Sequence, residues 1–442
     1  MKLSYKRTFF VGLAFMSISA FWQMYDSITP LILRNVYGLG DTLQGAIMAV
    51  DNVLALFMLP LFGMLSDSTK TPLGRRTPYI LGGTAATLVF MMLLPGAVLS
   101  GSIVFFMVVL GLLLLSLATY RSPAVALMPD VTPKPLRSKA NAVINLMGAL
   151  GGVVTLLLLG RLTPDSASRN YYPIFLSVAA FMAVCVLILF WKVKEPQMVR
   201  EMEEAQAAAG EPHEEAQAAA GEPHQEAPAA AAEEASSAPM APDVRRSLVL
   251  ILLSVFLWFM GYNAVITHFS KYVQFHWGVE GGGYAGILMI ATVAAVLSYL
   301  PAGMIASKIG RKKTILGGVV MLAAAFGSSL FFSAFTPLIY IFFALAGMGW
   351  ATINVNSYPM VVEMSKGSDV GKYTGYYYTF SMAAQIITPI LSGAVLEFLG
   401  YAWLFPYGCL FVALAFLTML AVRHGDSRPT PPPSKLEAFE EL

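Results

Sequence analysis

Long apolar stretches separated by short polar segments recur along the whole chain. Most of them hold about 18 residues or more with few charges, which is enough to cross a hydrocarbon core about 30 Å thick. The pattern predicts twelve membrane-spanning helices in two groups of six. The first group covers residues 8–33, 43–66, 78–99, 102–129, 138–161 and 171–192. The second group covers residues 246–274, 281–306, 314–334, 337–364, 372–399 and 401–423.

The predicted fold is an all-α membrane protein with twelve transmembrane helices in two pseudo-symmetric six-helix bundles. Residues 1–192 form the first bundle, residues 246–423 the second bundle, and residues 424–442 a cytoplasmic tail. Between the bundles, residues 193–245 form an acidic cytoplasmic linker rich in alanine and glutamate, with EEAQAAAGEPH twice in tandem. Because Gly-Glu-Pro interrupts each copy, we expect a flexible linker with at most short helical turns.

Composition and charge support a membrane location. Hydrophobic residues make up 57% of the chain and charged residues only 12%, whereas soluble domains have about 25% charged residues. The net charge is only +2, but most of the 28 lysines and arginines fall on the side that holds both termini. The opposite side has only four of them: Arg34, Arg161, Arg169 and Lys271. The positive-inside rule then predicts a multi-pass protein of the cell membrane with both termini in the cytoplasm.

A compact charge cluster lies between the second and third predicted helices. The segment Gly63–Tyr79, GMLSDSTKTPLGRRTPY, carries four charged residues: Asp67, Lys70, Arg75 and Arg76. A weaker copy, GMIASKIGRKKT, occupies Gly303–Thr314 in the second half. Finding a similar hairpin twice indicates that the protein contains two copies of one helical bundle, as transporters built from repeats do.

Two carboxylates lie within the predicted helices. Asp26 shares one helical stripe with Gln23 and Thr29, and Asp51 stands beside Asn52. A carboxylate in hydrocarbon is costly unless it faces protein or water, and burial disfavours its charged form. We therefore predict that Asp26 or Asp51 is the proton-coupling group, with Asp26 favoured because its stripe could also bind solute. The alternative is a structural carboxylate tied to a tyrosine or an asparagine.

The two halves share residues at nearly constant offsets. Asp26 matches Asn263 at an offset of 237, and Arg121 matches Asn354 at an offset of 233. The intramembrane charges are thus kept mainly in the first copy. The nearest cations to the aspartates in sequence are Arg34 and Arg121, and neither is expected close enough to hold both aspartates ionised.

Aromatic and neutral polar residues recur on the stripes of several predicted helices. Aromatic faces can stack on a sugar ring while amides and hydroxyls bond its hydroxyl groups, so we predict a sugar site from such residues. The candidate substrate-binding residues are Gln23, Tyr120, Arg121, Asn145, Tyr262, Asn263, Asn354, Tyr358, Tyr378 and Gln385. The alternative is that these residues hold the helices together by interhelical hydrogen bonds.

No catalytic or metal-binding pattern stands out. H-E-x-x-H and G-x-S-x-G are absent, and the glycine-rich Gly281–Gly286 follows no predicted strand, which argues against a nucleotide site. Cys185 and Cys409 lie within predicted helices and are interpreted as packing residues. We therefore predict no enzyme activity, no metal, no cofactor and no nucleic-acid partner.

With these residues in view, the membrane part of the chain resembles the major facilitator superfamily. The hairpin Gly63–Tyr79 is similar to the longer variant found in glycoside–pentoside–hexuronide:cation symporters and sucrose:proton symporters. Pro123–Asp130, followed by residues 137–141, is similar to their junction between the fourth and fifth helices. The resemblance implies alternating access around a central sugar site with cation coupling. It also implies a cytoplasmic gate formed by Asp67, Arg75, Arg76 and Arg311, although Ser307 stands at the aspartate position of the second copy.

Two departures from those families shape the functional prediction. Ala55 and Leu59 stand where sodium-coupled melibiose permeases have aspartates. A sodium site needs several oxygen ligands, so we expect this chain to lack that site and to be coupled to protons. Val125 stands where sucrose symporters have an arginine, so sucrose itself is not implied. The predicted function is proton-coupled symport of a sugar or glycoside, a small molecule, across the lipid bilayer. The alternatives are an exporter of an organic or hydrophobic solute and a non-transporting membrane sensor.

Overall fold

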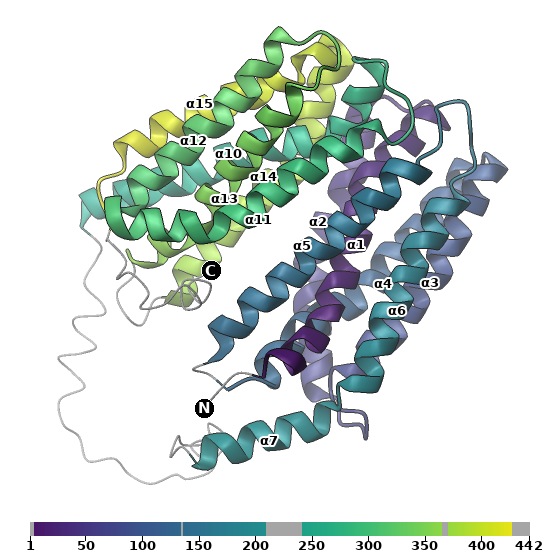
Figure 1. The fold of residues 1–442 in the computed structure, drawn as a ribbon, viewed down its shortest axis with the longest axis vertical. Coiled ribbons are helices and arrows are strands. Elements are labelled where there is room, and N and C mark those ends of the chain that lie inside the picture. Colours follow the sequence, from purple (N-terminus) through teal and green to yellow (C-terminus); the bar gives the residue numbers. More distant parts are fainter. Residues whose placement is uncertain (1–3, 134–135, 209–240, 365–369, 427–442) are drawn as a thin grey trace.

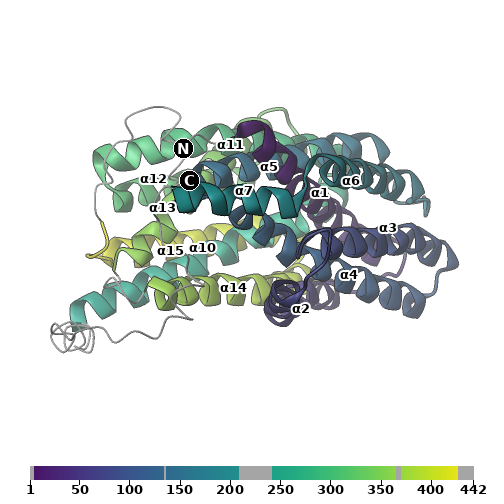
Figure 2. The ribbon, with the colours of Figure 1, turned by 90° about the horizontal axis from the view of Figure 1, so that it is seen from below.

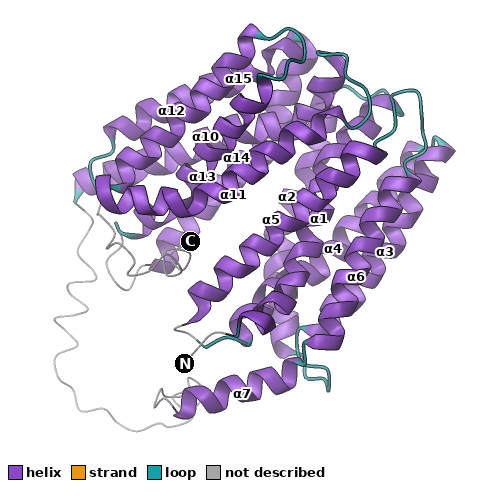
Figure 3. Cartoon of the chain, in the orientation of Figure 1, coloured by secondary structure: helices purple, strands orange, loops and turns teal. Residues whose placement is uncertain are grey.

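The structure is a computed structural model that describes residues 4–133, 136–208, 241–364 and 370–426 (Figure 1). The described residues are almost entirely helical, and Figure 3 shows no strand among them. Twelve of the described helices are long and apolar enough to cross a membrane. The predicted all-α fold with twelve membrane-spanning helices is confirmed.

The helices fall into two sets of six. The first set is α1 (Tyr5–Asn35), α2 (Asp41–Ser68), α3 (Thr77–Ser100), α4 (Ile103–Asp130), α5 (Arg137–Leu162) and α6 (Tyr172–Lys192). The second set is α10 (Pro242–Phe275), α11 (Gly283–Ile309), α12 (Arg311–Ser328), α13 (Ile339–Val362), α14 (Val370–Leu399) and α15 (Leu404–Ala421). Among the described residues between the sets, Glu195–Ala208 forms helix α7. Short 3₁₀ turns at Ser329–Phe331 and Tyr401–Trp403 complete the described elements.

Figures 1 and 2 show the two sets as separate bundles that lie side by side. The bundles meet mainly where α2 packs on α14, α5 on α11 and α1 on α10. Figure 1 shows them converging at one end and diverging at the other, where α1 begins, α15 ends and α7 lies. We call the diverging end the terminal end and the converging end the far end. At the far end Gly45 of α2 lies so close to Pro389 of α14 that a side chain there would clash with the Pro389 carbonyl.

The start of the predicted linker differs from the expectation. We expected at most short helical turns over residues 193–245, but Glu195–Ala208 forms a continuous helix of 14 residues. Glu195 is buried at its start, and an ion pair joins Glu201 to Arg7 of α1. These contacts with the first bundle stabilise a helix that the sequence alone would leave marginal. Residues 209–240, with most of the tandem repeat, and residues 427–442 of the tail lie outside the described residues.

The first bundle depends on close packing between α1 and α5. Gly151 of α5 faces the backbone of Met16, and a Cβ atom at Gly151 would lie 2.3 Å from the Met16 carbonyl oxygen. Backbone atoms cannot move aside as the end of a flexible side chain can, so only glycine fits. Small residues play this role widely in membrane helix packing, because they let helix backbones approach.

We predict that Gly151→Val destabilises the first bundle, because the valine side chain forces α1 and α5 apart. The expected loss is about 1–3 kcal/mol, as for other overpacked interiors. The measurement is thermal unfolding of the purified protein in detergent, followed by tryptophan fluorescence. Gly111→Val of α4 is the matched control, because a Cβ atom there meets nothing within 4 Å. Equal unfolding temperatures for the two variants would contradict this packing role.

Candidate functional site: a cavity between the bundles

A cavity of about 590 Å³ lies between the two bundles. It is lined from the first bundle by α1 and α5, and from the second bundle by α10, α11 and α13. Its polar lining residues are Ser19, Gln23, Asp26, Asn145, Thr292 and Asn354. Its aromatic lining residues are Phe15, Trp22, Tyr262, Tyr299 and Trp350. Such a volume and such a mixture of apolar walls and a few polar groups are typical of small-molecule sites.

The aromatic wall on the second bundle is ordered by a stacked pair. The rings of Tyr262 and Trp350 lie parallel, with centroids 3.6 Å apart and an interplanar angle of 2°. Phe259 packs its edge against Trp350, with the centroids 5.1 Å apart. The stack joins α10 to α13 and holds a flat aromatic surface at the cavity.

A second cavity of about 210 Å³ is lined from both bundles. Its polar lining residues are Asp26, Asp51, Asn52, Arg121, Asn263, Thr267 and Gln385. Trp22 and Asp26 line both cavities, so Asp26 is the carboxylate that the two share. The indole nitrogen of Trp22 and the amide nitrogen of Asn263 are buried and have no hydrogen-bond partner within the described part of the chain. They leave two donors at the cavities for a solute or water.

Arg121 lies nearer to the aspartates than the sequence analysis expected. It lines the second cavity together with Asp26 and Asp51, and the expectation that it does not hold both aspartates ionised stays a prediction. Its guanidinium carbon lies 5.2 Å from the ring centroid of Trp22, in a cation–π contact. Asp51 in turn accepts a hydrogen bond of 2.9 Å from the side chain of Asn52. Arg121 lies there because the rotation of α4 about its axis points this side chain toward α1 and α2.

The structure brings six further predicted substrate residues into two groups. Gln23, Asn145, Tyr262 and Asn354 line the larger cavity, and Asn263 and Gln385 line the smaller one with Arg121. Tyr120, Tyr358 and Tyr378 line neither cavity. Tyr120 is fully buried, and its Cβ atom packs close to Gly83 of α3. Tyr358 bonds Thr374 at 3.0 Å, and its ring lies 6.3 Å from that of Tyr378.

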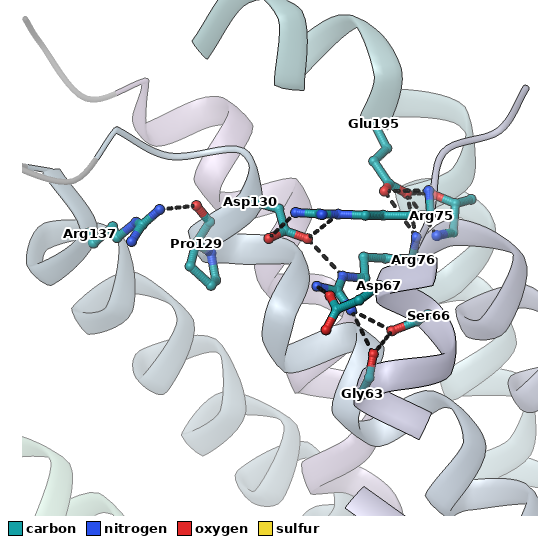
Figure 4. A network of polar contacts seen from close by, with 10 residues as sticks. Gly63, Ser66, Asp67, Arg75, Arg76, Pro129, Asp130, Arg137 and Glu195 are labelled. Carbon is teal, nitrogen blue, oxygen red and sulfur yellow. Dashed lines mark hydrogen bonds and ion pairs between the residues drawn. The ribbon is translucent and has the colours of Figure 1, made fainter. Parts of the chain in front are cut away.

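At the terminal end, the hairpin between α2 and α3 forms a network of ion pairs (Figure 4). The Arg76 guanidinium bonds Asp130 of α4 at 2.7 Å and also pairs with Asp67 of α2. Arg75 bonds the same Asp130 through two nitrogen atoms, at 2.8 and 3.1 Å. Burial opposes the charge of Arg76, but its hydrogen bond and charge contact with Asp130, and then those with Asp67, outweigh burial and raise its pKa.

Glu195 is a member of this network that sequence reasoning missed. Its carboxylate accepts hydrogen bonds from the backbone N–H groups of Arg75, Arg76 and Thr77, at 2.8–2.9 Å for the shortest of each. It also accepts a 2.7 Å hydrogen bond from the Thr77 hydroxyl. A carboxylate at the start of α3 satisfies unpaired N–H groups and suits the positive end of the helix. Glu195 was assigned to a flexible linker, so no local signal marked it.

The second bundle repeats this arrangement with other residues. Arg311 pairs with Glu363 at the end of α13 at 2.9 Å, and Asp426 accepts a 2.8 Å hydrogen bond from the backbone N–H of Lys312. Ser307 instead donates a hydrogen bond to the Met304 carbonyl. The second copy therefore keeps its arginine–carboxylate pair without an aspartate at position 307. In this state the described contacts of both hairpins lie within their own half, so a gate between the halves stays a prediction.

Residues 11–298 and 283–441 match the family model of the Major Facilitator Superfamily. The chain belongs to the Major Facilitator Superfamily. Two curated relatives are MFS-type transporters by name. The MFS-type transporter ppzB of Metarhizium majus is 29% identical over 131 residues, which is 29% of this chain and 28% of that relative. An uncharacterized MFS-type transporter of Schizosaccharomyces pombe is 29% identical over 116 residues, 26% of each chain. The matched segments thus span less than a third of either relative.

Solved structures share the superfamily fold over nearly the whole chain. The nucleoside transporter NupG aligns with a TM-score of 0.67 at 14% identity, covering 94% of this chain and 100% of that one. A D-xylose–proton symporter aligns with a TM-score of 0.65 at 15% identity, covering 95% of this chain and 98% of that one. At such identities the likeness concerns the fold alone.

We predict that Asp130→Asn destabilises this superfamily member more than Asp67→Asn. Asp130 is 12% exposed and pairs with two arginines, whereas Asp67 is 57% exposed and pairs with one. Removing a buried partner costs about 3 kcal/mol, and an exposed, screened pair contributes about 0–1 kcal/mol. The measurement compares the thermal unfolding temperatures of the two variants. In each, a carboxylate oxygen is replaced by an amide nitrogen, so the side chain keeps its size. A larger loss of stability in Asp67→Asn than in Asp130→Asn would show that Asp67 contributes more to the network.

Proposed function

We propose that the protein is a proton-coupled symporter of a sugar or glycoside that works by alternating access. The observation that carries the proposal is the position of Asp26, which lines both the neutral aromatic cavity and the smaller charged cavity. A group so placed can respond to a bound solute on one side and to a charged neighbour on the other. Coupling between solute and proton then needs no long-range signal.

The larger cavity suits an uncharged, hydroxyl-rich solute. Apart from Asp26, its lining residues carry no formal charge. The faces of Trp350 and Tyr262 offer apolar surface for the C–H face of a sugar ring, and amides such as Asn145 and Asn354 offer donors and acceptors for its hydroxyl groups. A hydrophobic solute would leave the buried indole nitrogen of Trp22 without a partner, which is costly. This supports a sugar over the alternative of a hydrophobic solute.

The smaller cavity suits a proton. Two carboxylates, Asp26 and Asp51, face one guanidinium, Arg121, so the three groups carry an unbalanced negative charge when all are ionised. Excess charge inside a bundle is costly, and one bound proton balances it. Sodium is disfavoured, because the positive charge of Arg121 in the same cavity repels a cation.

The arrangement of the bundles supports access from the terminal end. The bundles converge at the far end and diverge at the terminal end (Figure 1). Most of the described ion pairs at the terminal end join residues of the same half, so they do not tie the two bundles together. Opening the far end instead requires the contacts of α2 with α14 and of α5 with α11 to separate. Rocking of two rigid bundles around the site would accomplish this.

A nucleoside is a second candidate solute, favoured by one observation. The flat surface of Tyr262 and Trp350 could stack a nucleobase as well as a sugar ring, and the amides could bond its edge. The solved nucleoside transporter supports this candidate only through its fold.

Counterflow in proteoliposomes separates these candidates. We predict that vesicles loaded with unlabelled sugar or glycoside accumulate the same labelled solute transiently, without an imposed gradient, and that nucleosides do not replace it. Accumulation of nucleosides instead would select the second candidate. Absence of exchange for every solute in an inserted, folded preparation would favour a non-transporting sensor. Vesicles without protein give the background.

We predict that Asp26→Asn separates solute exchange from proton coupling. Asparagine resembles a protonated aspartate, so the variant keeps counterflow within about threefold of the parent, a change well under the tenfold that 1.4 kcal/mol represents. It should lose uphill uptake driven by a pH gradient. Asp51→Asn is the matched control from the smaller cavity, and it should keep some uphill uptake because Asp26 remains. If Asp26→Asn still concentrates solute in a pH-dependent way, Asp26 does not couple the proton.

A further inference from the structure

A buried ion pair joins the two bundles at the far end. The Lys271 amine of α10 lies 2.5 Å from a carboxylate oxygen of Asp41 at the start of α2. The side chain of Lys271 is 0% exposed and that of Asp41 is 3% exposed. Lys271 also donates a 2.8 Å hydrogen bond to the amide oxygen of Gln44. Charges this deeply buried are stable only when both are paired and hydrogen-bonded.

Asp41 has a further partner from the second bundle. The hydroxyl of Tyr401, in the turn before α15, lies 3.0 and 3.1 Å from the two carboxylate oxygens of Asp41. Asp41 and Gln44 thus belong to the first bundle, and Lys271 and Tyr401 to the second. We call these four residues the far-end cluster. Each charged group in it finds its partner across the boundary between the halves.

The far-end cluster is separate from the transport site and from the hairpin networks. None of its four residues lines either cavity. Among the described residues, Lys271 and Asp41 form the only ion pair between the two bundles. Other polar contacts between the bundles at this end are neutral or exposed. Asn35 bonds Gln274 at 3.2 Å, and Glu397 accepts a 2.8 Å hydrogen bond from the Thr42 N–H.

We propose that Asp41 and Lys271 are positioning residues that hold the far end closed and so set which side of the transport cavity is open. Separation of the bundles at this end must pull α2 from α10 and break the pair. In a dry interface, that step would leave two unpaired charges, which is strongly unfavourable. Water entering between the separated bundles hydrates both charges, so the closure is firm when dry and still reversible. The inference goes beyond the proposed function, because it concerns neither the solute nor the coupling ion.

The test measures access to each end of the cavity by cysteine labelling. Cys185 and Cys409 are first replaced by alanine, and a single reporter cysteine is then introduced. Thr163→Cys reports on the far end, because Thr163 is buried there and its hydroxyl lies 3.3 Å from that of Tyr284 on the other bundle. Ala149→Cys reports on the cavity. In sealed vesicles, a membrane-impermeant maleimide is supplied from the far-end side for Thr163→Cys and from the terminal-end side for Ala149→Cys. The rates are compared with and without Asp41→Asn plus Lys271→Met, which removes both charges together.

We expect the double substitution to speed labelling at Thr163→Cys about tenfold or more and to slow labelling at Ala149→Cys, as a population shift requires. Lys271→Met alone leaves Asp41 unpaired and should shift the rates further. Tyr401→Phe removes one hydroxyl, folds more readily, and should change both rates in the same directions by less. Glu397→Gln is the matched control, because this exposed contact also joins the bundles and should change either rate less than about twofold.

Opposite changes at the two reporters would support the closing role, since mere loosening of the fold would speed labelling at both. Unchanged rates in both the double variant and Tyr401→Phe, or faster labelling at both reporters, would overturn it. The assay uses no solute and no pH gradient. Its outcome is therefore independent of whether the transported solute is a sugar and whether the coupling ion is a proton.

Discussion

A charge inside the membrane is stable only where a partner or water compensates it, and this constraint organises the molecule. Three sets of charges meet it in three ways. Lys271 and Asp41 are buried as a hydrogen-bonded pair between the bundles. Arg76 shares Asp130 with Arg75 at the terminal end. Asp26, Asp51 and Arg121 face a cavity, where binding of a proton or a solute can change the balance.

The duplicated halves keep their scaffold and differ in their chemistry. Each half has an arginine after its second helix that pairs with a carboxylate at the end of its fourth, Arg76 with Asp130 and Arg311 with Glu363. In the membrane interior the copies differ, since Asn263 stands at the position of Asp26. The two bundles thus share one helical scaffold, but the first presents charged side chains to the cavities and the second presents neutral ones. The proposed coupling of solute and proton needs such an asymmetric site.

The sequence predicted what depends on local pattern. The twelve helices followed from the length of apolar runs, and Asp26 stood out because a carboxylate within such a run is costly. Asp41 and Lys271 were missed because each lies near a predicted helix end, where a charge normally meets water. Their pairing spans 230 positions of sequence and becomes visible only when the halves are placed together. Tyr120 lies outside both cavities for a related reason, because the sequence does not say which face of α4 turns inward.

We propose that solute and proton move together through the shared cavities. The most direct measurement is the internal pH of proteoliposomes that contain a trapped pH indicator, recorded as an uncharged transported sugar is added outside. The account predicts that sugar influx carries protons inward, so that the interior acidifies in proportion to the sugar taken up and stops acidifying when influx stops. Sugar influx of the same size with no change in internal pH would contradict it.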